Sequence, residues 1–109
     1  MKLAIIGSRN LNVDIEDYLT DDVTEIVSGG ARGVDSCAAL VASKRNVKLT
    51  EFKPNYSKYG RCAPLKRNDQ IAEYADEALA VWDGTSKGTQ YTVKAFQKLG
   101  KKVRVVIIK

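Results

Sequence analysis

The sequence predicts an α/β fold built on a doubly wound parallel sheet. Short apolar runs typical of strands alternate along the whole chain with segments whose apolar residues recur at helical spacing. Most of the strand-like runs are continuously apolar, as expected where helices cover both faces of a sheet. With 109 residues, the chain can form one core but not two. We therefore expect one Rossmann-like, three-layer domain over residues 1–109.

Five segments are predicted strands, and we expect them to pair in the order 3-2-1-4-5. The third is the weakest, because lysines interrupt it, and is expected at an edge of the sheet. Right-handed crossover connections limit the possible orders, and the order chosen here reverses between the first and fourth strands. The strands are Lys2–Ile6, Glu25–Ser28, Val47–Phe52, Glu77–Trp82 and Val103–Ile108.

The first two predicted helices follow the first two strands. Asn12 can cap the first of them, and the polar run at residues 20–22 breaks it. Its apolar face consists of Ile15, Tyr18 and Leu19. The second helix begins at Val34, directly after a glycine-rich loop, and has further apolar residues at positions 37, 38 and 41. This i, i+3, i+4, i+7 stripe indicates a helix packed on one side.

The second half of the chain supplies two more helices. A loop follows the third strand and contains Tyr56, Tyr59 and Gly60. Pro64 suits the first turn of the third helix, which runs to Ala75. The fourth helix follows the loop at residues 83–89 and ends near Leu99, with Gly100 as its C-cap.

Composition excludes several classes of chemistry. The chain has no histidine, which excludes His-dependent triads, imidazole acid–base catalysis and most zinc sites. Cys37 and Cys62 lack the C-x-x-C spacing of redox and zinc motifs, and we expect two buried or half-buried thiols. No segment has the length of a signal peptide or membrane span, so we expect a cytoplasmic protein with no membrane partner. We also expect no metal and no cofactor. The formal charge of +5 favours anionic partners.

The predicted site is the edge where the parallel strands end. Ligands of such sheets bind outside the carboxyl ends of the strands, where the strand order reverses. Glycine permits tight turns and close approach of a phosphate, and the amides at a helix N-terminus attract an anion. The same glycines could instead simply make strand–helix turns. The candidate ligand-binding residues in the three loops are Gly7, Ser8 and Arg9, then Gly29, Gly30, Ala31, Arg32 and Gly33, and finally Asp83, Gly84, Ser86, Gly88 and Thr89.

Individual side chains add candidates, each with a structural alternative. Arg9, Arg32 and Arg67, expected at or just after strand ends, could clamp a phosphate or be ordinary surface arginines. Asn68 lies on an apolar helix face and needs a partner, either a ligand or a neighbouring loop. Asp35 could bond a ribose hydroxyl or only favour the start of its helix.

Asp83 and three aromatic residues complete the candidates. Asp83 could contact a ligand or cap its own loop. Tyr56, Tyr59 and Trp82 could stack on a base, although packing is the favoured interpretation.

The glycine-rich loop carries a family resemblance. Ile26-Val27-Ser28-Gly29-Gly30-Ala31-Arg32-Gly33-Val34-Asp35, followed by Ala38-Ala39, resembles the motif V-S-G-x-A-x-G-I-D-x-x-A of the DNA-processing protein DprA. DprA belongs to the SLOG superfamily, which also includes the LOG phosphoribohydrolases. Tyr59-Gly60-Arg61-Cys62-Ala63 and then Arg67-Asn68 resemble small stand-alone YspA/YpsA-related members. The resemblance implies a Rossmann-like fold, a nucleotide or nucleotide-derived ligand and a homodimer.

Two departures from the family pattern limit what the resemblance implies. LOG enzymes have P-G-G-x-G-T-x-x-E, whereas Thr92 stands here where their catalytic glutamate would fall. DprA carries further domains around this one.

Three hypotheses follow. The first is a module that binds a nucleotide-like phosphate ligand. The second is a hydrolase of an N-glycosidic or phosphate bond in such a ligand, which needs a carboxylate from Asp83, Asp35 or Glu73. The third is a module that binds single-stranded DNA, favoured by the positive charge and the tyrosines.

Overall fold

The sheet has five parallel strands in the order β3-β2-β1-β4-β5, which confirms the predicted topology. The structure is a computed structural model that describes residues 1–8, 14–29 and 34–108, the side chains of residues 35 and 36 excepted. The strands are β1 (Lys2–Gly7), β2 (Glu25–Ser28), β3 (Lys48–Glu51), β4 (Glu77–Trp82) and β5 (Lys102–Ile107). Ala4 of the central strand pairs with Val27 on one side and Ala78 on the other. The lysine-bearing third strand is at an edge, as predicted.

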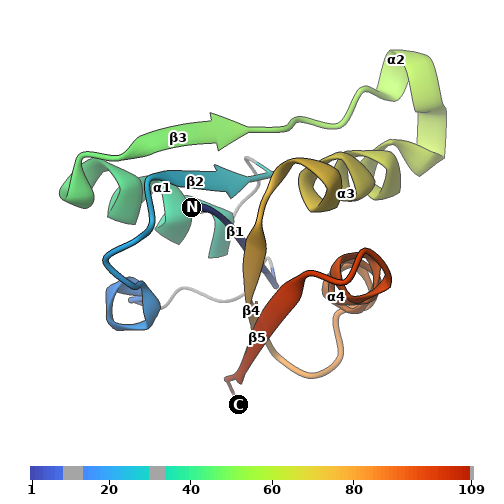
Figure 1. The fold of residues 1–109 in the computed structure, drawn as a ribbon. Helices are drawn as coiled ribbons and strands as arrows, with labels where there is room; N and C mark the ends of the chain where they lie inside the picture. The colour runs from blue at the N-terminus through green and yellow to red at the C-terminus, as the bar shows by residue number, and fades with distance from the viewer. Residues whose placement is uncertain (9–13, 30–33, 109) are drawn as a thin grey trace.

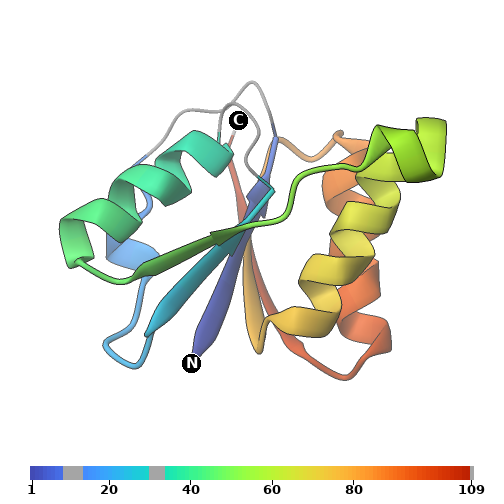
Figure 2. The same ribbon diagram turned by 90° about the horizontal axis from the view of Figure 1, so that it is seen from above.

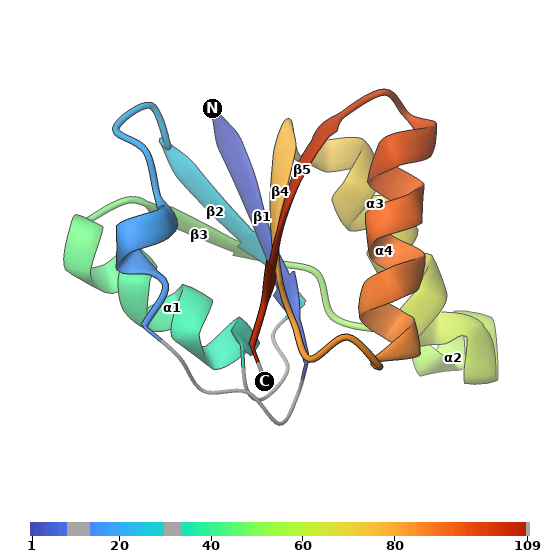
Figure 3. The ribbon, with the colours of Figure 1, turned by 90° about the horizontal axis from the view of Figure 1, so that it is seen from below.

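Helices cover both faces of the sheet and produce the three expected layers. The helix α1 (Val34–Arg45) and the short 3₁₀ helix η1 (Glu16–Tyr18) lie on one face, whereas α3 (Ala63–Tyr74) and α4 (Lys87–Lys98) lie on the other (Figures 2 and 3). Within the described ranges, no helix combines the length and the apolar character that crossing a membrane requires.

The central strand β1 supplies both halves of the core because its side chains alternate between the two faces. Leu3 and Ile5 are fully buried in the cluster under α1. Ala4 and Ile6 point the other way, into a cluster with Phe96 of α4 and the apolar face of α3. Many members of this second cluster are alanines, and such small side chains let α3 and α4 pack close to the sheet.

The predicted helix between the first two strands is much shorter in the part of the chain that the structure describes. Residues 14–24 contain only the three-residue helix η1, while Asn12, its predicted cap, lies outside the described residues. The predicted apolar face is nevertheless used, because Ile15 and Leu19 are buried. A segment of this length cannot offset the cost of starting an α-helix, so the chain makes one 3₁₀ turn and anchors it with the two apolar residues.

The loop predicted at residues 56–60 is wrong, because this segment is helical. It forms α2 (Tyr56–Tyr59) and η2 (Gly60–Cys62), which project beside α3 (Figure 1). The cause is a local cap: the side chain of Asn55 accepts a hydrogen bond from the amide of Lys58 at 3.2 Å. The projection leaves Cys62 exposed and Tyr56 59% exposed. The expected burial of Cys62 and the expected packing role of Tyr56 are therefore both wrong.

α4 ends at the predicted glycine, but Gly100 is the residue after the C-cap rather than the C-cap itself. The cap residue is Leu99, and Gly100 follows with a φ of 73°. The amide of Lys101 donates to the carbonyl of Phe96 at 3.0 Å and that of Gly100 to Gln97 at 3.0 Å. This pair of bonds is a Schellman motif, which needs a residue in the left-handed conformation just after the helix.

Candidate functional site

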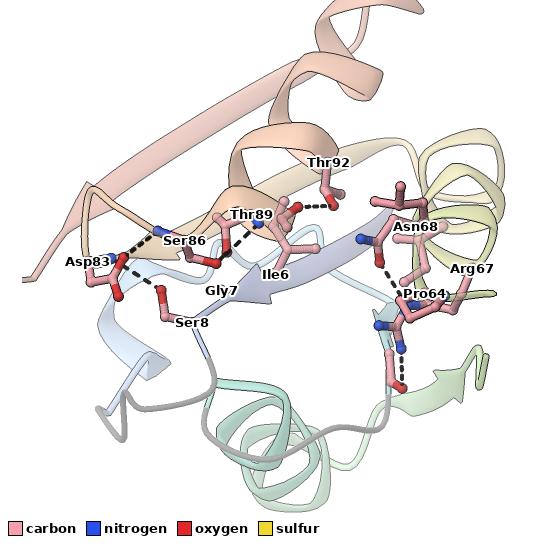
Figure 4. A pocket seen from close by; sticks show the side chains of 14 residues that line it. Ile6, Gly7, Ser8, Pro64, Arg67, Asn68, Asp83, Ser86, Thr89 and Thr92 are labelled. Atoms are coloured by element: carbon pink, nitrogen blue, oxygen red, sulfur yellow. Dashed lines mark hydrogen bonds between the residues drawn. The ribbon is translucent and has the colours of Figure 1, made fainter. Parts of the chain in front are cut away.

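A pocket of about 460 Å³ lies at the carboxyl edge of the sheet, where the strand order reverses. Its walls come from the ends of β1, β2 and β4 and from the first turns of α3 and α4 (Figure 4). The lining residues are Ile6, Gly7, Ser8, Gly29, Pro64, Leu65, Arg67, Asn68, Ile71, Asp83, Ser86, Gly88, Thr89 and Thr92. The predicted edge therefore does contain a pocket.

The end of β1 forms the floor of the pocket and is closely packed. A β-carbon on Gly7 would lie 2.2 Å from the carbonyl oxygen of Val81 and 2.8 Å from Cγ2 of Val34. Packing alone thus requires a glycine at this position. Ser8 follows, only 2% exposed, with its amide donating to the carbonyl of Val81 at 3.2 Å. This bond extends the contact between β1 and β4 to the pocket itself.

Arg67 brings a buried positive charge to one wall. Its side chain comes from α3 and is 8% exposed. Nη1 donates to the carbonyl oxygens of Gly29 at 2.8 Å and Phe52 at 3.4 Å, and Nε donates to Oδ1 of Asn68 at 2.7 Å. The guanidinium thus ties the ends of β2 and β3 to α3. Arg67 is not at a strand end as predicted; it reaches one from a helix.

Arg67 is the hydrogen-bond partner of Asn68, and it also occupies the space that a side chain at position 29 would need. The carboxamide of Asn68 accepts from Arg67 rather than from a distant loop. A β-carbon on Gly29 would lie 2.4 Å from Nη1 of Arg67. The close approach that glycine permits at this position is therefore used by the guanidinium.

Asp83 brings a negative charge to the opposite wall (Figure 4). Its Oδ1 accepts hydrogen bonds from the amides of Thr85 and Ser86, both at 2.9 Å, and its own amide donates to Oγ of Ser8 at 3.3 Å. The two accepted amide bonds hold the pKa of the Asp83 carboxyl below its usual range. The carboxylate thus caps its own loop, one of the two predicted roles, and Gly84 completes the turn with a φ of 86°.

The first turn of α4 borders the pocket between these two charges. Ser86 is the N-cap, and its Oγ accepts from the amide of Thr89 at 3.4 Å. The next two amides, of Lys87 and Gly88, belong to the turn in which backbone N–H groups lack helical acceptors. No acceptor among the described residues takes them. The hydroxyl of Thr92 donates to the carbonyl of Gly88 at 2.9 Å.

Most of the predicted site residues that the structure describes come together here. Gly84 is the exception, because it does not line the pocket. Arg9, Gly30, Ala31, Arg32, Gly33 and the side chain of Asp35 lie outside the described part of the chain. Of the carboxylates considered for a hydrolase, Asp83 lines the pocket, whereas Glu73 is exposed near the far end of α3.

Five lining residues were not predicted as ligand-binding: Ile6, Pro64, Leu65, Ile71 and Thr92. The spacing of α3 could have indicated two of them. Pro64, Arg67, Asn68 and Ile71 stand at i, i+3, i+4 and i+7, so they form one stripe along the helix. A single helical face therefore presents both the charged and the apolar groups of this wall.

The arrangement can hold a polar ligand by charge and hydrogen bonding. A guanidinium, the first-turn amide of Gly88 and a carboxylate surround a space with apolar side chains at its base. In the described residues, no three His, Cys, Asp or Glu side chains gather to hold a metal ion. No family model, no curated protein and no solved structure matches this chain.

Proposed function

We propose that this protein binds a nucleotide or nucleotide-derived phosphate ligand in the pocket at the carboxyl edge of its sheet. The observation that carries the proposal is the buried guanidinium of Arg67 in the wall of a pocket of about 460 Å³. Small-molecule sites have volumes of roughly 300–1,000 Å³, with a few placed polar groups. A guanidinium is positively charged at every physiological pH, so this wall of the pocket favours a phosphate by charge.

The start of α4 supports the same ligand chemistry. The amides of Lys87 and Gly88 lie at the positive end of the helix dipole. A β-carbon on Gly88 would meet no atom within 4 Å, so this wall is open to a ligand. Anionic and hydrogen-bonding atoms of a ligand can therefore reach the backbone amide of Gly88.

Membership of the SLOG superfamily is part of this proposal. Gly29, Arg67 and Asn68, which carry the resemblance, all line the pocket. Thr92, at the position of the LOG glutamate, has its hydroxyl bonded to the carbonyl of Gly88. A hydroxyl held in this way supplies neither a negative charge nor an acid, which favours a binding module over a LOG-type hydrolase.

Calorimetric titration with ribonucleoside mono- and diphosphates, NAD and ADP-ribose tests the proposal. A matched pair of variants locates the site: Gly88→Leu places a large side chain at the pocket, and Gln90→Leu places the same side chain on the exposed side of α4. We expect Gly88→Leu to weaken binding at least tenfold and Gln90→Leu to bind as wild type. The proposal fails if no member of the panel binds wild type at millimolar concentration, or if both variants bind equally.

A second candidate function, binding of single-stranded DNA, is favoured by the surface around α2. Residues 52–68 contain five Lys and Arg and no Asp or Glu. Four of these cations are exposed, together with Tyr56. Basic groups interleaved with aromatic rings suit a single strand, because bases can stack while lysine and arginine contact phosphates.

Fluorescence anisotropy with a labelled oligonucleotide tests this candidate. Binding should weaken steeply as salt rises, because counterions are released from the strand. The double variant Lys58→Glu/Arg61→Glu should lose binding, whereas Lys98→Glu, on the last turn of α4, should change it little. Absence of a complex at low salt would exclude this function.

A further inference from the structure

The pocket is chemically asymmetric, since Arg67 and Asp83 lie on opposite walls (Figure 4). Arg67 is bonded at the end of β2, and Asp83 directly follows β4. β1 lies between these two strands, so the two strand ends are about 10 Å apart at the usual spacing between strands. One end of a ligand therefore meets a cation and the other an anion.

The loop after β4 already contains its own anion. Two of its amides, those of Thr85 and Ser86, are taken by the Asp83 carboxylate. A phosphate placed against this loop would lie beside a like charge and would lack those two donors. The favourable place for the phosphate is the side of the pocket toward Arg67, where the guanidinium attracts it and the first-turn amide of Gly88, which Asp83 does not take, borders the same pocket.

The Asp83 carboxylate retains hydrogen-bonding capacity after capping its loop. An ionised carboxylate has two oxygens and about four lone-pair positions, all of them acceptors. Both amide bonds given above go to Oδ1. These amides are the main cause that lowers the pKa of Asp83, the hydroxyls of Thr85 and Ser8 act more weakly in the same direction, and the group is ionised at neutral pH. A ligand group that complements the second oxygen must be a donor, and the vicinal hydroxyls of a ribose are such donors.

We infer that Asp83 is a specificity-determining residue that accepts hydrogen bonds from ribose hydroxyls while Arg67 holds the phosphate at the opposite end of the ligand. This inference rests on the proposed nucleotide site and gives the ligand a direction within it. The pocket then selects ribonucleotides over analogues without sugar hydroxyls, because a carboxylate left facing an empty position loses its partner.

The test compares adenosine 5′-monophosphate with its 2′,3′-dideoxy analogue, or the equivalent pair for whichever base binds best. Wild type should bind the ribonucleotide at least tenfold more tightly, since a hydrogen bond to a charged group is worth about that factor. Asp83→Asn should bring this ratio close to one. Its carbonyl oxygen can still accept the two loop amides, so the turn is preserved. Asp69→Asn, the same change on α3 outside the pocket, should leave the ratio at its wild-type value.

Arg67→Lys distinguishes the two ends of the ligand. It keeps the charge but loses the planar fork, so it should weaken both monophosphates by the same factor and leave their ratio unchanged. A wild-type ratio near one, with the ribonucleotide bound, overturns this inference and leaves the proposed function standing. A ratio that persists in Asp83→Asn has the same consequence. Failure of every nucleotide to bind wild type overturns both.

Discussion

Gly7 and Gly88 both line the pocket, but they are glycines for different physical reasons. The position of a β-carbon on Gly7 is occupied by a backbone oxygen of β4 and by Val34. Gly88 lies in the first turn of α4, where a β-carbon would meet nothing within 4 Å. The stability of the fold thus depends on Gly7, whereas Gly88 matters only for ligand binding.

Replacing each glycine by alanine should separate these roles. Gly7→Ala should lower the free energy of unfolding by about 1–3 kcal/mol, because a backbone oxygen in a paired strand cannot move aside. Gly88→Ala should raise it by about 0.4–1 kcal/mol, because alanine restricts the unfolded chain. Urea unfolding of the two variants and wild type gives both values. Equal destabilisation by the two changes would contradict the packing explanation.

Glu25 at the start of β2 is a buried carboxylate held by two hydroxyls. Tyr74 and Thr50 donate to its Oε2 at 2.5 and 2.7 Å. The bond from Tyr74 is the main cause that holds the pKa of Glu25 below its usual range, with the positive charges of Lys48 and Lys2 acting in the same direction. Folding therefore favours the ionised form of this side chain.

A depressed folded-state pKa makes stability depend on pH with a definite sign. The contribution of Glu25 is fully present above its unfolded-state pKa and is lost as the pH falls through its folded-state pKa. Its share of the free energy of unfolding should therefore decline below about pH 5. Tyr74→Phe removes the main bond and should flatten this decline relative to wild type. Tyr56→Phe, at an exposed tyrosine, is the control, and equal acid slopes for both variants would refute the assignment.

For single residues, the sequence could indicate which residue types form the site but not which atoms contact one another. Gly29 was predicted in a ligand loop because its missing side chain permits close approach. The group that approaches is the guanidinium of Arg67, which is 38 residues away in the chain. Periodicity could not predict that contact, because it depends on how α3 crosses the end of β2.

At the scale of the elements, the last turn of α3 is capped by a side chain from outside the helix, that of Lys101. Nζ of Lys101 donates to the carbonyls of Ala72, Glu73 and Ala75 at 2.7–2.9 Å. These oxygens lie at the negative end of the helix, where a cation is favourable. Lys101 directly follows the turn that ends α4, so one ammonium group joins the ends of both helices.

Removing this ammonium should destabilise the α3–α4 layer. Lys101→Met keeps most of the aliphatic stem but leaves three carbonyls without their donor, and should lower the free energy of unfolding by about 1–3 kcal/mol. Lys102→Met, at the exposed next residue, should change it by less than about 0.5 kcal/mol. Denaturant unfolding measures both, and similar values for the two variants would show that the cap contributes nothing.

The longer elements could be predicted from sequence and the short ones could not. All five strands, α1, α3 and α4 fall within a few residues of their predicted bounds, because each has a periodic apolar pattern long enough to detect. The apolar pattern around η1 spans only Ile15 to Leu19, and the residues of α2 have no such pattern. Whether they form turns or helix depends on single contacts such as the Asn55 cap, which a periodicity argument does not include.

Across the whole molecule, charge is divided unevenly between the two halves of the chain. Residues 52–109 carry twelve Lys and Arg against five Asp and Glu, whereas residues 1–51 carry six against eight. The basic half supplies α2, α3 and α4 and therefore one complete wall of the pocket. An anionic ligand should approach from this side, and its association should slow as salt screens the field.

The pocket also joins the two halves of the fold, because β1 and β2 belong to one and α3, β4 and α4 to the other. A ligand that binds only the folded state should then stabilise the whole domain by mass action. At a concentration one hundred times its Kd, the gain is about 2.7 kcal/mol. For a domain of this size, each kcal/mol raises Tm by about 4–8 °C.

Thermal unfolding with the best-binding nucleotide should therefore show one cooperative transition that shifts upward by at least 10 °C at that concentration. Gln90→Leu should shift as wild type does, and Gly88→Leu should not shift, because the ligand cannot enter. An equal upward shift in Gly88→Leu would place the binding site elsewhere on the molecule. If the transition split in two when the ligand is added, the ligand would stabilise only one half of the fold, and the pocket would not couple the two halves.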